Sequence, residues 1–287
     1  MNSPRRLKVS TENAAFQVLE SLSRNRTARH RAGAFLVEGV LPITRALDHA
    51  WTIDAVVQIA GATLSGWAAD VIRRAAPQRR YELTPALMAR LCGRADGSEL
   101  LAVVRMADPD IARVPIGHDL LALVLDRPGN PGNLGTIVRS CDALGADGVI
   151  VTGHAVDIYD PAVITASRGS LFAVPVVPVA SHAEVIGWRD AVRARLGRCL
   201  LVGADERGAE EIAGHDFTAP TIVVLGNETA GLSRAYRDAC DARVRIPMHG
   251  AASSLNVAVA ASVMLYEAAR QRRAAGASPR SLAPPGQ

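Results

Sequence analysis

The chain has 287 residues, of which 49% are hydrophobic and 21% charged, which suits a packed core and is unlike a disordered protein. No apolar run approaches the ~18–20 residues that cross a bilayer, so we expect no membrane-spanning segment. The four cysteines have neither C-x-x-C spacing nor histidines at zinc spacing, which predicts reduced, buried thiols, no metal site and a cytoplasmic protein.

The formal net charge of +4 is unevenly spread along the chain. Residues 1–107 carry 15 basic and 9 acidic side chains, whereas residues 108–287 carry 17 and 19. A cationic front end beside a near-neutral remainder is typical of a polyanion-binding module attached to a catalytic body, although a solvated tail would look the same. Lys8 is the only lysine, which excludes a P-loop and a Schiff-base lysine in the body of the protein.

The first part of the chain predicts a small α/β unit. Strands are expected at residues 34–37, 53–59, 81–83 and 100–105, and helices at residues 41–49, 64–74 and 85–91. Residues 108–118 contain two prolines and a glycine and show no clear period, which predicts a linker. We therefore expect a domain at 1–107, a linker at 108–118 and a second domain at 119–273.

From residue 119 the alternation of strands and helices is cleaner. Strands are expected at residues 120–125, 148–151, 173–177, 199–202, 221–225 and 243–246, and helices at 134–144, 161–168, 182–196 and 255–273. Continuous apolar strands between helices predict a parallel sheet covered on both faces. Residues 274–287 are rich in Pro, Gly, Ser and Ala and predict a disordered tail.

Three clusters rich in Gly, Asn and Ser follow strands of the second domain, at residues 126–139, 225–233 and 246–257. In an open parallel sheet, ligands bind beyond the carboxyl ends of the strands. Glycines let the backbone approach a ligand, and the amides at a helix N-terminus favour carboxylate or phosphate. Each cluster alone is also explained as an ordinary turn with a capping residue.

Two side chains in these clusters need a chemical reason. Arg139 lies six residues after Asn133 among apolar neighbours, and an arginine there calls for a carboxylate or phosphate partner. Glu228 is the only acid of the second cluster. A dinucleotide-dependent enzyme is the generic alternative, but the glycines give G-x-x-G-x-x-G instead of G-x-G-x-x-G.

The three clusters contain N-x-G-x-x-x-R at 133–139, L-G-x-E-x-x-G-L-S at 225–233 and I-P-M-x-G-x-x-x-S-L-N-V at 246–257. In this order they resemble the motifs of the SpoU/TrmH branch of the SPOUT class of RNA methyltransferases. The segment F-L-V-E-G-V at 35–40 is similar to the start of that family's substrate-binding domain, although Arg45 stands where the family often has Glu. The resemblance implies an α/β protein in which a trefoil-knotted parallel-sheet methyltransferase domain follows a small L30e-like α/β domain.

The resemblance also implies a reaction: transfer of a methyl group from S-adenosylmethionine to a ribose 2′-hydroxyl of RNA. It implies a homodimer with active sites at the interface. Ribosomal RNA is the preferred substrate. A methyltransferase that confers antibiotic resistance is one kind of enzyme with that substrate. A transfer RNA 2′-O-methyltransferase and a non-catalytic RNA-binding protein on the same scaffold are the alternatives.

Site residues follow from the motifs by resemblance. The implied catalytic residues are Arg139, Asn133, Glu228, Ser254 and Asn256. The implied cofactor contacts are Leu225, Gly226, Asn227, Ile246, Pro247 and Leu255. The candidate RNA-binding residues are Arg29, Arg31 and Arg168. Because a guanidinium stays protonated, we expect Arg139 to clamp a phosphate and stabilise the developing oxyanion in the partner's pocket, while a phosphate oxygen or Glu228 takes the proton.

Overall fold

The structure is a computed structural model that describes residues 4–94 and 97–276. The described residues form two compact units, each of which is considered by itself. Unit 1 contains residues up to 107 together with residues 159–173, and unit 2 contains residues 108–158 and those from 174 onward. The chain therefore leaves unit 2 once and returns to it.

The described part of unit 1 is built on a sheet with the strand order β1-β4-β3-β5-β2. These strands are β1 (Arg5–Val9), β2 (Ala34–Glu38), β3 (Ile53–Ile59), β4 (Arg79–Leu83) and β5 (Leu100–Arg105). β1, β4 and β3 are mutually parallel, whereas β5 runs antiparallel to both β3 and β2. The carboxyl ends of three neighbouring strands therefore meet at one edge of this sheet.

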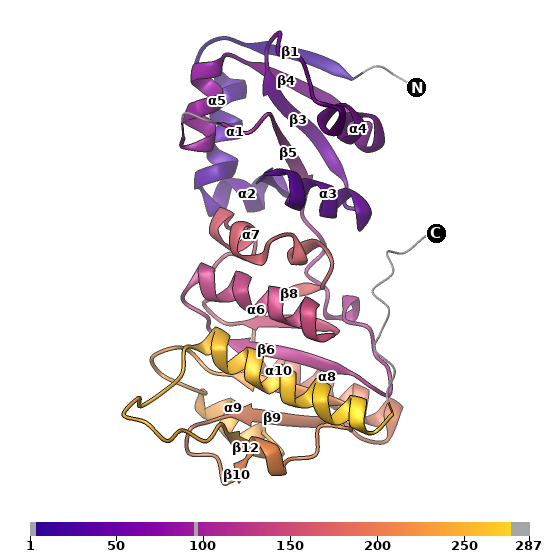
Figure 1. The fold of residues 1–287 in the computed structure, drawn as a ribbon, viewed down its shortest axis with the longest axis vertical. Coiled ribbons are helices and arrows are strands. Elements are labelled where there is room, and N and C mark those ends of the chain that lie inside the picture. Colours follow the sequence, from indigo (N-terminus) through magenta and orange to yellow (C-terminus); the bar gives the residue numbers. More distant parts are fainter. Residues whose placement is uncertain (1–3, 95–96, 277–287) are drawn as a thin grey trace. The chain divides into compact units, whose positions relative to one another are not determined.

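Helices cover both faces of the unit 1 sheet (Figure 1). They are α1 (Ala14–Arg24), α2 (Arg26–Ala32), α3 (Val40–Asp48), α4 (Gly66–Ala75) and α5 (Pro85–Cys92). In Figure 1, α1 and α5 lie on one side of the sheet, and α3 and α4 on the other. Phe16, Leu19 and Leu22 recur on one face of α1 and are buried against the strands, as an amphipathic helix requires.

The segment that returns to unit 1 contains α7 (Pro161–Ser167) and a short 3₁₀ turn (Ser170–Phe172). Its aromatic side chains pack into unit 1: the ring centroids of Tyr159 and Phe35 are 4.6 Å apart, and those of Phe172 and Trp51 are 5.2 Å apart. The indole Nε1 of Trp51 also donates a hydrogen bond to the carbonyl oxygen of Phe172 at 2.9 Å. Residues 159–173 thus complete the core of unit 1.

The described part of unit 2 is built on an entirely parallel sheet with the order β10-β12-β9-β11-β6-β7-β8. Its strands are β6 (Leu121–Asp126), β7 (Gly148–Thr152), β8 (Val176–Val179), β9 (Leu200–Ala204), β10 (Glu210–Glu211), β11 (Thr221–Leu225) and β12 (Ala242–Arg245). β6, β7 and β11 are buried along their whole length, as their continuous apolar sequences predict.

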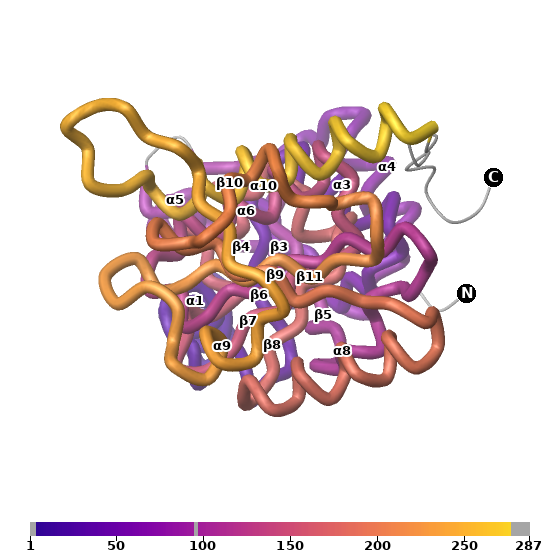
Figure 2. Tube along the Cα trace, turned by 90° about the horizontal axis from the view of Figure 1, so that it is seen from below, coloured from indigo at the N-terminus to yellow at the C-terminus, as the bar shows by residue number. Residues whose placement is uncertain are grey.

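Two pairs of helices enclose the unit 2 sheet (Figure 2). α6 (Pro131–Leu144) and α10 (Val257–Ala274) lie on one face, and α8 (His182–Leu196) and α9 (Arg234–Ala239) on the other. The hydroxyls of Ser140 and Ser262 lie 2.8 Å apart and join α6 to α10. Among the residues described, no helix is long and apolar enough to span a bilayer.

The predicted strands and helices are confirmed, with shifts of a few residues at their ends. The last helix starts at Val257 because Asn256 is its N-cap: the Asn256 Oδ1 accepts a hydrogen bond from the amide of Ala258 at 2.8 Å. The elements that the sequence did not predict are β1, α1, α2, β10, α9 and the 3₁₀ turns. The predicted tail lies outside the described residues from 277 onward, and the trefoil knot stays a prediction.

The four cysteines are free thiols, as predicted. Cys141 and Cys199 are buried as expected, whereas Cys92 and Cys240 are only partly buried. Burial raises the pKa of Cys199 to about 11. Burial likewise raises the pKa of Cys240 to about 12. These thiols are therefore protonated and weakly nucleophilic near neutral pH.

Candidate active site

The three clusters singled out in the sequence meet at the carboxyl edge of the unit 2 sheet. They follow β6, β11 and β12, which are parallel, and they line one cavity of about 1160 Å³. Pockets for small ligands typically measure ~300–1,000 Å³, so the space is large enough for a cofactor and part of a substrate. The strand-end rule thus located a single site from three separate segments.

The first cluster places Asn133 in the first turn of α6. The helix starts there because the Asn130 side chain accepts a hydrogen bond from the Asn133 amide at 3.0 Å, and Pro131 occupies the first helical position. The Asn133 side chain consequently leaves the helix start at a fixed direction. It lines the cavity, as predicted.

Three of the predicted catalytic side chains form one hydrogen-bonded chain. The Nδ2 of Asn256 donates to the Oδ1 of Asn133 at 3.2 Å, and the Nδ2 of Asn133 donates to the Oε1 of Glu228 at 3.3 Å. The backbone amide of Gly129 donates to the Oε2 of Glu228 at 3.2 Å. Both ends of the Asn133 amide are therefore engaged, which fixes its orientation.

Glu228 is held as a carboxylate. Partial burial would by itself raise its pKa, but hydrogen bonds from the backbone amides of Glu228, Gly129 and Asn130 and from the Asn133 side chain outweigh it and lower the pKa. A carboxylate surrounded by donors is a poor proton acceptor near neutral pH. Its clearest task in the structure is to orient Asn133.

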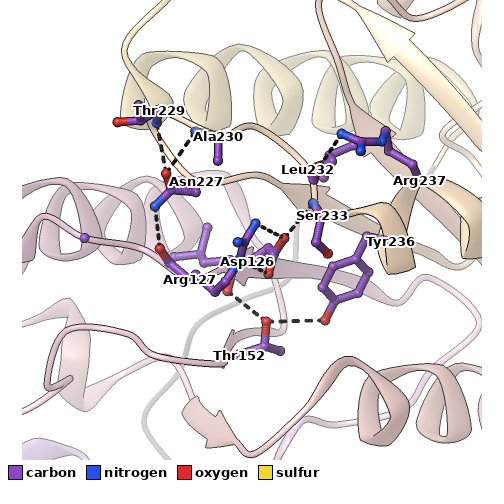
Figure 3. A network of polar contacts seen from close by, with 12 residues as sticks. Asp126, Arg127, Thr152, Asn227, Thr229, Ala230, Leu232, Ser233, Tyr236 and Arg237 are labelled. Atoms are coloured by element: carbon purple, nitrogen blue, oxygen red, sulfur yellow. Dashed lines mark hydrogen bonds and ion pairs between the residues drawn. The ribbon is translucent and has the colours of Figure 1, made fainter.

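The second cluster forms a tight loop at the end of β11. Asn227 and Gly231 exchange backbone hydrogen bonds of 3.0 and 2.9 Å. The Asn227 Oδ1 accepts from the amides of Thr229 and Ala230 at 3.0 Å each, and its Nδ2 donates to the carbonyl of Arg127 at 2.8 Å (Figure 3). This side chain thereby ties the second loop to the first.

Only glycine fits at position 226, because the backbone of the loop closes tightly against it. A Cβ at this position would lie 2.1 Å from the backbone carbonyl carbon of Gly231, a distance that no side chain tolerates. The backbone of residue 226 therefore borders the cavity without a side chain.

Beneath the loops lies a buried polar network (Figure 3). Asp126 is 4% exposed; its Oδ1 pairs with the Nε of Arg127 at 3.0 Å, and its Oδ2 accepts from the amide of Ser233 at 2.8 Å. Next to it, the hydroxyl of Tyr236 donates to the Oγ1 of Thr152 at 3.5 Å. Asp126 thus joins the end of β6 to the start of α9, a role that the sequence did not assign to it.

The third cluster runs from the end of β12 to the cap of α10. In Figure 2 this segment extends outward from the sheet. It brings Ile246, Ser254, Leu255 and Asn256 to the cavity. Every predicted cofactor contact lines the cavity except Pro247.

Arg139 is the predicted catalytic residue that does not line the cavity of its own chain. It is exposed on α6, and within the described residues it has no hydrogen bond or ion pair. The carboxylate or phosphate that the sequence demanded for it is therefore not supplied by the described part of this chain.

The three candidate RNA-binding arginines differ in how accessible their side chains are. Arg29 is only 2% exposed; it donates to the carbonyl of Leu22 at 3.2 Å and pairs with Asp160 at 3.6 Å. It is a structural residue of unit 1 and does not fit an RNA contact. Arg31 and Arg168 are both exposed, and Arg168 ends α7 in the left-handed conformation at a φ of 53°.

Sequence reasoning missed a fourth loop at the same edge. Asp205, Glu206 and Arg207 follow β9 and line the cavity, and the Asp205 carboxylate pairs with Arg243 at 3.2 Å. The signal was available, since these residues directly follow a predicted strand and the strand-end rule applies to them equally. No group of metal-ligating side chains occurs among the residues that the structure describes.

Comparison with known proteins places this geometry in a family. Residues 120–266 match the family described as SpoU rRNA Methylase, and residues 13–102 match the SpoU L30e-like domain. A 23S rRNA (uridine(2479)-2′-O)-methyltransferase of Streptomyces viridochromogenes is 45% identical over 271 residues, 94% of either chain.

Solved structures agree. The SpoU methyltransferase AviRb from Streptomyces viridochromogenes, in complex with AdoMet, is 46% identical with a TM-score of 0.85 over 91% of this chain and 98% of that one. An AdoMet-bound rRNA methyltransferase from Sinorhizobium meliloti is 27% identical with a TM-score of 0.82 over 92% of this chain and 98% of that one.

The parallel sheet, its three-loop cavity and these likenesses define an S-adenosylmethionine-dependent RNA 2′-O-methyltransferase. The chain belongs to the SpoU rRNA methylase family. The fold class expected from the motifs, an α/β methyltransferase domain preceded by an L30e-like domain, is confirmed.

The cavity fits the cofactor on its own chemistry. Leu225, Ile246 and Leu255 supply apolar surface for an adenine ring, and the side-chain-free backbone at Gly226 gives a flat edge beside it. The same cavity is lined by the carboxylates of Asp205 and Glu206 and by the guanidinium of Arg207. Groups of both charges suit a ligand that itself carries charges of both signs.

Proposed function

We propose that this protein methylates the ribose 2′-hydroxyl of a uridine in 23S ribosomal RNA, as a homodimer in the cytoplasm. The observation that carries the proposal is the hydrogen-bonded chain from Asn256 through Asn133 to Glu228, in a protein whose relative over 94% of its length is a 23S rRNA uridine 2′-O-methyltransferase. The predicted site residues other than Arg29 and Pro247 are part of this proposal. So is the division into a front and a catalytic domain, with residues 159–173 assigned to the front unit and residues 108–118 to the catalytic unit.

The dimer is supported by exposed apolar side chains on α10. Val259 is 49% exposed and Tyr266 54%. Exposed apolar side chains gathered on one element favour an interface. Arg139 is exposed on α6, the helix that packs against α10 through the contact between Ser140 and Ser262.

The chemistry needs few groups from the protein. When bound, S-adenosylmethionine supplies an electrophilic methyl group. Asn133, whose amide is oriented from both sides, positions the ribose at the cavity. Arg139 of one subunit enters the partner's cavity, holds the phosphate next to the target ribose and stabilises the negative charge that develops on the 2′-oxygen.

The proton of the 2′-hydroxyl does not go to Glu228 in this scheme. Donors already surround that carboxylate and lower its pKa. A phosphate oxygen of the RNA held by Arg139 is the acceptor we propose.

The substrate is tested by incubating the purified protein and S-adenosylmethionine with 23S rRNA, 16S rRNA and bulk transfer RNA, followed by mapping of 2′-O-methyl sites. We expect one new modified uridine, in 23S rRNA. Modification of transfer RNA alone, or none in any arm while the cofactor binds, contradicts the proposal.

The shared site is tested by mixing two inactive variants. We expect Arg139→Ala to lower kcat by at least ~100-fold, the size of a lost oxyanion-stabilising donor. Mixed dimers of Arg139→Ala and Gly226→Ala regain activity only if Arg139 acts on the partner's cavity, because one of the two sites is then intact. No recovery in dimers shown to be mixed places Arg139 in its own chain's site.

A further inference from the structure

A second cavity lies in unit 1, far along the sequence from the methyltransferase motifs. It measures about 890 Å³ and opens at the carboxyl ends of β1, β3 and β4. Its polar lining side chains include Arg6, Lys8, Gln58, Arg80 and Glu82. We call it the β1–β4 cleft.

The strand register puts these side chains on one face. Lys8 of β1 pairs with Glu82 of β4, which pairs with Gln58 of β3, so the three form a row across the sheet. Arg6 and Arg80 form the row two residues earlier. Because side chains two residues apart point to the same face of a strand, both rows line the cleft. The opposite face of these strands packs on α1 and α5.

Glu82 is the central group of this cleft. It is only 8% exposed, and within the described residues its carboxylate accepts no hydrogen bond; its nearest cationic atom is the Nη1 of Arg6, 3.9 Å away. Its carboxylate lines the cleft, where donors from a ligand can replace the solvent around it. Gln58, its neighbour across the row, is 5% exposed.

Arg80 adds a second unmet group. Its Nη2 donates to the Oε1 of Gln58 at 2.9 Å, whereas its Nε is enclosed without an acceptor in the described structure. The guanidinium nevertheless lines the cleft, and only its Nη2 is engaged by a side chain within the described residues, so it has a further N–H donor for an acceptor brought by a ligand. The cleft therefore offers a carboxylate without hydrogen-bond donors beside a guanidinium that is only partly engaged.

We propose that the β1–β4 cleft binds a guanine nucleotide of the RNA strand. Guanine carries two adjacent N–H donors, at N1 and N2, which match the two oxygens of Glu82, and the neighbouring O6 accepts from Arg80. Adenine, cytosine and uracil do not place two adjacent donors on one edge. This inference rests on RNA being the substrate, as proposed above.

The rim of the cleft supplies the phosphate contacts. The Arg6 side chain is 67% exposed, and Lys8, also exposed, stands next to it on β1. Cations at the rim hold the backbone of a strand whose base enters the cleft, and base-edge contacts inside provide the selectivity. Unit 1 then reads one unpaired guanosine other than the methylated nucleotide.

Fluorescence anisotropy with the full-length protein tests this. Three labelled pentanucleotides, UUGUU, UUIUU and UUAUU, are titrated; inosine retains the N1–H and lacks the N2 amine. We expect guanosine to bind about 10-fold more tightly than adenosine, with inosine between them. Equal affinity of the wild-type protein for all three overturns the proposal without any variant.

Variants test whether Glu82 is responsible for the preference for guanosine. We expect Glu82→Gln to bind the three oligonucleotides equally and the matched control Asp70→Asn, on the exposed surface of α4, to discriminate as the wild type does. Undiminished discrimination in folded Glu82→Gln overturns the assignment of the cleft. Displacement of UUGUU by free GMP as effectively as by unlabelled UUGUU means a free-nucleotide site and overturns the RNA assignment.

The two proposals fail separately. Glu82-dependent discrimination in a protein that leaves 23S rRNA unmodified keeps the cleft and removes the proposed function. Modification of 23S rRNA without any discrimination among the pentanucleotides does the reverse.

Discussion

Both units of this protein present the carboxyl ends of parallel strands, yet the two edges are built in opposite ways. At the edge of unit 2, Asn133, Asn227 and Glu228 are engaged by partners within the chain. At the edge of unit 1, Glu82 lacks a hydrogen bond and the Arg80 Nε lacks an acceptor within the described residues. The first edge is preorganised, as catalysis requires, and the second leaves its polar groups to a ligand.

The strongest way to break this comparison is to disorder the unit 2 edge. Gly226→Ala introduces a Cβ 2.1 Å from the backbone of Gly231, so the loop must shift. We expect cofactor affinity measured by calorimetry to fall by at least ~100-fold, as misplacements of about 1 Å can cost that much. The matched control is Gly187→Ala in α8, where a Cβ meets nothing within 4 Å. Unchanged cofactor affinity in Gly226→Ala would show that cofactor binding does not depend on the tight loop at residues 226–231.

A milder perturbation removes one charge from the same edge. Glu228→Gln keeps the shape but weakens the hold on Asn133, and we expect kcat to fall about 10-fold, the size of one charge-assisted hydrogen bond. Because the folded pKa of Glu228 lies below its ordinary value of 4.5, the carboxylate stabilises the folded protein above that pH and loses this effect as the pH falls through the lowered pKa.

The pH–rate profile decides the role of Glu228. Because the lowered pKa keeps Glu228 ionised, we expect its titration to cause no change in the wild-type rate between pH 6 and 9. A fall in rate toward lower pH within that range, absent from Glu228→Gln, would identify Glu228 as the proton acceptor. That result would contradict its assignment as a positioning residue.

The smallest expected effect sharpens the comparison at the unit 1 edge. Arg6→Gln removes one rim cation of the β1–β4 cleft, and the slope of log Kd against log salt for RNA should fall by about 0.7–1, one phosphate contact. Arg73→Gln, which removes an equally exposed charge from α4, serves as the control. An identical slope in both variants would remove Arg6 from the RNA surface.

Much of unit 2 could be predicted because its signals are local. Continuous apolar strands ending in Gly, Asn and Ser clusters predicted both the sheet and the edge where its loops meet, and the cavity there has the predicted residues around it. The fourth loop, at Asp205, obeys the same rule and was within reach.

What sequence patterns left out depends on contacts between distant segments. Nothing local distinguishes Arg29, which is buried against Asp160, from Arg31, which is exposed two residues later. The charge of residues 5–9 conceals an edge strand that exists because it pairs with β4. Arg139 was found by its motif, but its exposed side chain contacts no carboxylate among the described residues, so one chain alone does not explain its role.

The excursion of residues 159–173 into unit 1 constrains how this protein can be recombined. A gene fusion cut once between 107 and 108 would strip Phe35 and Trp51 of the rings of Tyr159 and Phe172, exposing apolar surface on both fragments. Chimeras that graft this front unit onto another enzyme therefore need a second splice that carries α7 along. Shuffling within the family is accordingly expected to exchange the two pieces together.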